Sequence, residues 1–122
     1  MKYLLMIYDD EKLWDAMSPA ESDAYLGEYF SFTDGVRASG QYVAGEALQP
    51  VATATTVRIR DGKLSTTDGP FAETKEQLGG FYLVEARDLN EAIQVAAKIP
   101  SARIGSIEVR PVIDFMADQQ PS

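Results

Sequence analysis

Apolar and polar residues alternate along several short segments of the chain, a period of two that predicts β-strands. Residues 2–8 and 81–86 carry apolar side chains on both alternating faces, which is typical of central strands covered on both sides. The other predicted strands alternate less regularly and cover residues 41–48, 53–60, 63–67 and 106–113. The pattern therefore indicates a sheet whose middle is formed by the first strand and by the strand that begins at Phe81.

Two other segments carry apolar side chains three and four residues apart, the spacing of one helix face. Ser18 and Glu21 can form a capping box, so a helix is predicted from there to about Ser39. A second helix is predicted after Asp88, which can cap it. The apolar stripes expected to face the core are Tyr25, Tyr29, Phe32 and Val36, widened by Leu26 and Phe30, in the first helix, and Leu89, Ala92, Ile93, Ala96 and Ala97 in the second.

The order of these elements predicts an α+β fold. Asp61-Gly62 is typical of a two-residue hairpin turn, so the strands on either side of it are expected to form an extra hairpin arm. Without that arm the order is the split βαβ, ferredoxin-like arrangement, with two helices on one face of a mostly antiparallel sheet. We expect a single domain at residues 1–113, followed by a polar C-terminal tail at residues 114–122.

Two helices on one face leave the other face of the sheet uncovered. The residues expected to lie on it are Leu4, Met6, Tyr82 or Phe81, and Val84 or Leu83. A continuous apolar patch that is exposed on one face of a sheet is normally an interface. We therefore expect a homodimer of the dimeric α/β-barrel type, in which two sheets face each other and enclose a cleft. The charged residues expected near this cleft are Glu46, Arg58, Glu108 and Arg110.

Composition narrows the chemistry that is available. The chain has 122 residues, of which 45% are hydrophobic and 25% charged, the balance of an ordinary globular domain. It contains no cysteine and no histidine, which excludes disulfides, thiol nucleophiles, serine-histidine pairs and histidine-bound zinc. Any acid or base must be an aspartate, glutamate, lysine or tyrosine.

The net charge of −8 excludes further classes of partner. A field of that sign repels nucleic acid and anionic lipid, so we expect no direct nucleic-acid binding. The sequence also lacks a run of the ~20 apolar residues that a membrane span requires. Its first residues lack the basic region and long apolar core of a secretory leader, so we expect none. We expect a cytoplasmic protein with no membrane partner.

The densest motif is the nine-residue segment Asp68–Glu76. Within it, Gly69, Pro70 and Phe71 are predicted to form a rigid turn that the phenyl ring anchors in the core. The charged candidates of the segment are Asp68, Glu73 and Lys75 as catalytic residues and Glu76 as a ligand-binding residue. The alternative is that these charges form a solvated face.

Further ligand-binding candidates come from the predicted sheet. Glu108 and Arg110 are two residues apart on a strand, so they share a face and offer an acceptor beside a bidentate anion-binding donor. Arg58 and the Tyr82 hydroxyl are expected to join them. The alternative is an exposed ion pair and a tyrosine that only fills space. No calcium-loop or phosphate-loop spacing occurs, so we expect neither a metal nor a cofactor.

The motif resembles the signature of the DGPF-domain group of the YCII-related family. The resemblance extends along the chain through Lys2–Tyr8, Thr53–Arg58, Asp68–Glu76 and Gly105–Pro111. It implies a dimeric ferredoxin-like α+β barrel. Some members of the wider family look like small enzymes with a histidine-aspartate pair, which this chain lacks, and DGPF-group members resemble proteins encoded beside extracytoplasmic-function sigma factors.

Two functions follow as expectations. In the first, the chain is a dimeric protein that binds an unidentified small molecule in a cleft and acts as a sensor or adaptor linked to transcription regulation, with a sigma factor or another regulatory protein as a possible partner. In the second, it is a small histidine-free enzyme that uses carboxylate and lysine acid-base chemistry. The missing histidine favours the first.

Overall fold

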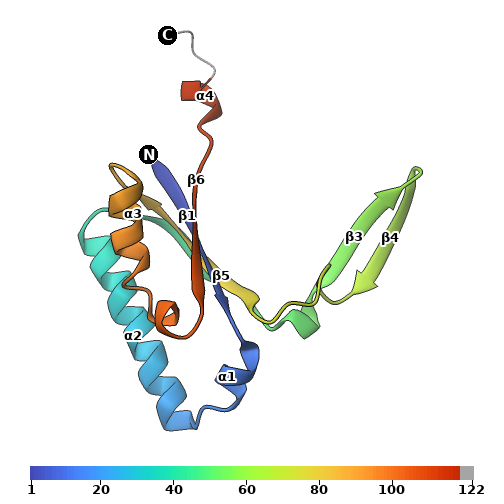
Figure 1. Ribbon diagram of the computed structural model, residues 1–122, viewed down its shortest axis with the longest axis horizontal. Helices are drawn as coiled ribbons and strands as arrows, with labels where there is room; N and C mark the ends of the chain where they lie inside the picture. The colour runs from blue at the N-terminus through green and yellow to red at the C-terminus, as the bar shows by residue number, and fades with distance from the viewer. Residues whose placement is uncertain (119–122) are drawn as a thin grey trace.

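The body of the molecule is a four-stranded antiparallel sheet with α2 and α3 on one of its faces (Figure 1). The computed structural model describes residues 1–118. The strand order is β2-β5-β1-β6, which is consistent with the predicted split βαβ arrangement. The elements are β1 (Lys2–Asp9), α1 (Glu11–Asp15), α2 (Pro19–Ala38), β2 (Tyr42–Ala47), η1 (Val51–Thr53), β3 (Thr55–Arg60), β4 (Lys63–Asp68), β5 (Gln77–Glu85), α3 (Leu89–Ala96), η2 (Pro100–Arg103), β6 (Ser106–Pro111) and α4 (Phe115–Asp118).

The core lies between the sheet and the two helices. Tyr3, Leu5 and Ile7 of β1 are buried, whereas Leu4 and Met6, on the opposite side of the strand, are only half-buried. The helix-facing residues of the other elements complete the cluster: Tyr82 and Val84 of β5, Phe32 and Val36 of α2, and Ala92, Val95 and Ala96 of α3. The two sides of the central strands therefore differ, because helices cover one side and the other side forms an open sheet face.

Helix α2 begins as the sequence predicts. Ser18 caps it, and its side chain and that of Glu21 form a reciprocal capping box. The expected stripe is only partly correct, because Leu26 and Phe30 remain 42% and 67% exposed. These two side chains do not widen the core and instead border a pocket described below.

The stripe predicted for α3 is also partly wrong. Ala92 and Ala96 are buried as expected, but Leu89 and Ile93 are each 49% exposed and Val95 is buried in their place. The helix has only eight residues, so a small rotation about its axis decides which apolar side chains reach the sheet.

The predicted hairpin arm is present and projects away from the body (Figure 1). Strands β3 and β4 pair with each other in a separate two-stranded sheet. Asp61 and Gly62 both have positive φ angles, 52° and 74°, as a two-residue hairpin turn of the predicted kind requires. The structure places β4 at Lys63–Asp68, so the arm ends where the motif begins.

A β-bulge interrupts the pairing of β1 with β5. Ile7 pairs with Gly80 and Tyr8 pairs with Leu78, so Gly79 has no partner residue on β1. The extra residue shifts the rest of β5 by one position and brings Gln77 opposite Asp9.

The chain end beyond β6 contains the short helix α4 within the predicted tail. The last four residues of that tail, 119–122, lie outside the described residues. Among residues 1–118, no helix is long and apolar enough to cross a membrane.

Candidate functional site

A buried carboxylate is the centre of the polar network in this molecule. Asp9 at the end of β1 is only 4% exposed, although it occupies the same side of the strand as Tyr3, Leu5 and Ile7. Its Oδ2 atom accepts hydrogen bonds from Trp14 Nε1 and from Ser101 Oγ, both at 3.1 Å. A charged group is retained in a core only when such donors compensate its lost hydration.

The hydroxyl of Ser101 connects this carboxylate to two tyrosines of α2. Ser101 is fully buried, and its Oγ atom is hydrogen-bonded to the hydroxyls of Tyr25, at 3.1 Å, and Tyr29. A serine hydroxyl has one proton and two lone pairs. Since the proton is donated to Asp9, both tyrosines must donate to Ser101. The order of donation is therefore tyrosine to serine to carboxylate.

Close backbone approach holds the network together. The backbone N–H of Gly105 donates to the Ser101 carbonyl at 2.7 Å, which tightens the turn after η2. A Cβ atom at Gly105 would lie 2.1 Å from the Tyr8 carbonyl oxygen and 3.0 Å from Asp9 Cα. Only glycine allows the segment that carries Ser101 to pack this closely against the end of β1.

A pocket of about 450 Å³ opens beside this network, between α2 and the ends of β2 and β5. Aromatic residues form a large part of its wall. They are Trp14, Tyr29, Phe30, Tyr42 and Tyr82, and the lining also includes Phe81, whose side chain lies on the open face of the sheet opposite Met6. An apolar concave site with a few convergent polar atoms is the usual form of a small-molecule site.

Small residues on the helix-facing side of the sheet create this space. Gly45 pairs with Tyr82, and Gly80 pairs with both Ala47 and Ile7. A Cβ atom at Gly45 would lie 2.9 Å from Tyr82 Cδ1 and would press against that ring. The lack of side chains at these positions leaves α2 separated from this end of the sheet.

The hydroxyls of the threonine and tyrosines that line the pocket are already used as hydrogen-bond donors. Thr33 Oγ1 donates to the Tyr29 carbonyl at 2.9 Å and is bonded to the Tyr82 hydroxyl at 2.7 Å. Tyr82 must therefore donate to Thr33, just as the Tyr29 hydroxyl donates to Ser101. Both phenolic oxygens can therefore still accept hydrogen bonds but have none left to donate.

A larger hollow of about 810 Å³ lies along a different face of α2, next to η2 and the end of α3. Its wall includes one aromatic ring, Phe32, and the exposed ion pair of Arg103 with Glu28 at 2.9 Å. It contains none of the residues of the Asp9 network, so the smaller pocket is the better candidate site.

Burial changes the acidity of the tyrosines in the network. It raises the pKa of Tyr29 from 10.0 to about 12, an effect that the hydrogen bond to Ser101 partly offsets. Burial likewise raises the pKa values of Tyr25 and Tyr82. All three hydroxyls therefore keep their protons at neutral pH.

We expect an alkaline titration followed by tyrosine absorbance to show one phenol that ionises near pH 12. Because the pKa of Tyr29 is higher in the folded than in the unfolded chain, its contribution to stability is fully present below pH 10 and is lost as the pH rises through 12. Tyr29→Phe should remove the late phase. Ionisation of all the tyrosines together near pH 10 would contradict the assignment.

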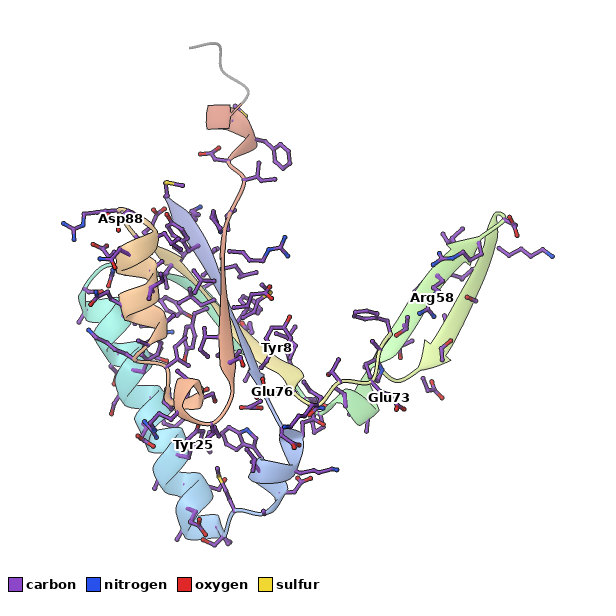
Figure 2. All side chains as sticks on the ribbon, in the orientation of Figure 1. Tyr8, Tyr25, Arg58, Glu73, Glu76 and Asp88 are labelled. Atoms are coloured by element: carbon purple, nitrogen blue, oxygen red, sulfur yellow. The ribbon has the colours of Figure 1, made fainter. Side chains whose placement is uncertain are left out.

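The structure distributes the charged candidates of the motif over the surface. Asp68, Glu73 and Lys75 are exposed (Figure 2 shows Glu73 at the foot of the arm). Lys75 borders a small hollow of about 300 Å³ between the motif and α1. Glu76 is half-buried, and its Oε1 accepts a hydrogen bond from Ser106 Oγ at 2.8 Å. None of the four lines the aromatic pocket.

The predicted role of Phe71 is wrong. Gly69 has the positive φ angle, 99°, that favours glycine in a turn, but the Phe71 side chain is 81% exposed and anchors nothing in the core. The loop is held by polar contacts instead. Gln77 Oε1 accepts from the Glu11 backbone N–H at 3.0 Å, and Gln77 Nε2 donates to the Thr74 carbonyl at 2.6 Å.

The candidates on the sheet do not gather at one place either. Glu108 and Arg110 are exposed on the open face of β6, opposite Met6 and Leu4. Arg58 lies on the arm (Figure 2). Tyr82 points the other way, into the helix-facing core, so the expected group of Tyr82 with Glu108 and Arg110 is wrong.

Sequence reasoning missed the residues that form the network. One signal was available, because Asp9 continues the buried phase of β1 and a carboxylate at a core position calls for donors. Ser101 carried no such signal. It is 92 residues away from Asp9 in the chain, and only the fold shows that they meet.

The sequence matches one family model along nearly its whole length. The model of the YCII-related domain matches residues 1–116. The chain belongs to the YCII-related family. The resemblance of the motif and its flanks to that family is thus confirmed. A YCII-related relative, the uncharacterized protein R00369 of Rhizobium meliloti (strain 1021), is 35% identical over 124 residues, which cover 100% of both chains.

A solved structure is similar to this YCII-related chain at low identity. It is 5-chloro-2-hydroxyhydroquinone dehydrochlorinase (TftG) from Burkholderia phenoliruptrix AC1100, in complex with 2,5-dihydroxybenzoquinone. The identity is 14%, the match covers 93% of this chain and 94% of that chain, and the TM-score is 0.48. A likeness at this level carries no argument about the ligand or the reaction of this chain.

Proposed function

We propose that this protein binds a small, flat, mostly apolar molecule that carries a hydrogen-bond donor, such as a phenol or an aromatic amine. The observation that supports the proposal is the hydrogen bonding of the two tyrosine hydroxyls that line the pocket. The hydroxyls of Tyr29 and Tyr82 donate their hydrogen bonds to Ser101 and Thr33, so towards a ligand they can only accept.

The aromatic walls select the rest of the ligand. Trp14 and Phe30 offer ring surface to a planar molecule, and ring pairs of this kind contribute about 0.5–1.5 kcal/mol beyond the area they bury. A ligand that lacks a donor leaves the two phenolic oxygens desolvated without a partner. The pocket therefore favours a donor-bearing ring over a ring of the same shape without a donor.

In this proposal the chain acts as a ligand-binding sensor or adaptor, and a regulatory partner responds to the occupied pocket.

A second candidate function is enzymatic. It is favoured by the Tyr29, Ser101 and Asp9 chain, which links a pocket hydroxyl to a buried carboxylate and offers a path for a proton. Asp9, rather than Asp68 or Glu73, would be the base. A compound that binds both wild type and Asp9→Asn, but is converted only by wild type, would establish this function.

The binding proposal predicts that phenol binds more tightly than anisole, which has a similar shape but no donor. We expect a ratio of about two to ten, the value of one net hydrogen bond. Trp14 is the only tryptophan of the chain and lines the pocket, so its fluorescence reports occupancy directly. Phe30→Ala should weaken both compounds, and Tyr29→Phe should reduce the ratio.

Ile93→Ala is the matched control, because Ile93 is an exposed apolar helix residue that does not line the pocket. It should bind both compounds as wild type does. Equal affinities for phenol and anisole would refute the donor requirement, and no binding of either by wild type would refute the pocket as a site for small aromatic molecules.

A further inference from the structure

One face of the hairpin arm is apolar and exposed. Ile59 pairs with Leu64 and Val57 pairs with Thr66, so these four side chains share a face. Val57, Ile59 and Leu64 are 59%, 65% and 69% exposed. The opposite face pairs Arg58 with Ser65, Arg60 with Lys63 and Thr56 with Thr67, and is polar and cationic. The arm is therefore amphipathic, although nothing in residues 1–118 of its own subunit covers its apolar face.

A two-stranded hairpin with an uncovered apolar face has little stability of its own. Isolated hairpins are at best marginally stable in water, and they gain stability when an apolar face is covered. The described part of the chain offers no third strand to the arm, because β3 and β4 pair only with each other. The alternation that creates the apolar face thus indicates a surface that another molecule covers.

The direction of the arm identifies where that molecule lies. Figure 1 shows the helices on one side of the main sheet and the arm projecting on the other side, the side of the open sheet face. That face carries half-buried Leu4 and Met6, which pair with Leu83 and Phe81. A molecule that covers the open face therefore lies alongside the arm, within reach of strands about 20 Å long.

Charge favours a second copy of this chain as that molecule. Residues 55–68 contain three cationic and two acidic side chains and carry a net charge of +1. Since the whole chain carries −8, the rest of it carries −9. The arm is thus cationic whereas the rest of the chain is strongly acidic in sum, so the arm is attracted to the acidic body of a copy.

We propose that the β3–β4 arm is a dimer clasp. Two copies pair through their open sheet faces, and each arm extends past its own sheet and places Val57, Ile59 and Leu64 on the body of the other copy. This proposal goes beyond the ligand pocket and does not depend on it, because Val57, Ile59 and Leu64 do not line that pocket.

The arm can be removed without cutting the body. The Gly69 backbone N–H donates to the Ala54 carbonyl at 2.7 Å, so the two ends of the arm are adjacent. A variant with two glycines in place of residues 55–68 should therefore keep the main sheet. Analytical ultracentrifugation should show a wild-type dimer at micromolar concentration and a dissociation constant at least tenfold higher for the shortened chain.

Point substitutions separate the apolar face from the fold of the arm. Ile59→Thr with Leu64→Thr keeps strand-forming residues but removes apolar surface, and should also raise the dissociation constant at least tenfold. Thr56→Ser with Ser65→Thr changes the opposite face and should leave it unchanged. Far-ultraviolet circular dichroism verifies that each variant retains the wild-type fold.

The absence of cysteine from the sequence allows a direct test of contact. A thiol-reactive label should modify Ile59→Cys at least tenfold more slowly than Ser65→Cys at concentrations where wild type is dimeric, and at similar rates on dilution to monomer. A monomeric wild type would overturn the proposal. So would a dimer whose dissociation constant and labelling rates do not respond to the arm, even if phenol still binds the pocket.

Discussion

Gly105→Ala should be among the most destabilising single substitutions in this protein. The added Cβ atom would lie 2.1 Å from the Tyr8 carbonyl oxygen and 2.9 Å from Asp9 Cβ, and the first of these is a backbone atom that cannot rotate away. The turn after η2 must then move as a unit. We expect a loss of about 3 kcal/mol or more in the free energy of unfolding, which lowers Tm by roughly 10 °C.

The displaced turn carries Ser101, so Gly105→Ala should also disturb the polar network that Ser101 completes. Gly27→Ala is the matched control, because a Cβ atom there meets nothing within 4 Å and Gly27 lies inside α2. It should raise stability by up to about 1 kcal/mol through helix propensity. Thermal unfolding of both variants measures the difference, and a Gly105→Ala variant as stable as wild type would show that the close approach does not exist.

Asp9→Ala should cost about 2–4 kcal/mol, because it leaves the buried N–H of Trp14 and the O–H of Ser101 without their acceptor. Asp9→Asn should cost less, since its amide oxygen still accepts one or both bonds. Urea unfolding gives the free energies, and Trp14 fluorescence should shift in both variants because the indole N–H contacts this side chain.

The opposite outcome for Asp9→Ala is physically meaningful. Removing a buried charge sometimes stabilises a protein when its partners are apolar or can relax. A gain in stability in Asp9→Ala would therefore mean that the donors do not compensate the carboxylate and that its retention reflects chemistry rather than folding.

The sequence predicted the scaffold because local rules decide most of it. The alternation in residues 2–8, the capping box at Ser18 and the Asp61-Gly62 turn each specify their element from a few neighbouring residues, and each is present in the structure. Errors arose where geometry beyond the element decides the outcome. Phe30 follows the helical spacing, yet it is exposed because glycines on the facing strands leave a gap there.

The candidate site was harder to predict than the fold. Charge density drew attention to the motif at Asp68–Glu76, but polar residues that are dense in sequence are usually solvated, and most of these are. The network around Asp9 is sparse in sequence. Its members come from β1, α1, α2 and η2, so no window of the chain contains it.

The bulge at Gly79 determines which side chains at the start of β5 point towards the helices and which point towards the open face of the sheet. Upstream of it, Leu78 pairs with Tyr8 on the open face, whereas regular pairing of the same residues would place Leu78 opposite Asp9 and turn its isobutyl group inward against the carboxylate. The bulge places Gln77 opposite Asp9 instead. Because Gln77 also bonds to the Glu11 N–H and the Thr74 carbonyl, the extra residue decides which side chain lies between the buried carboxylate and the loop that leads to the arm.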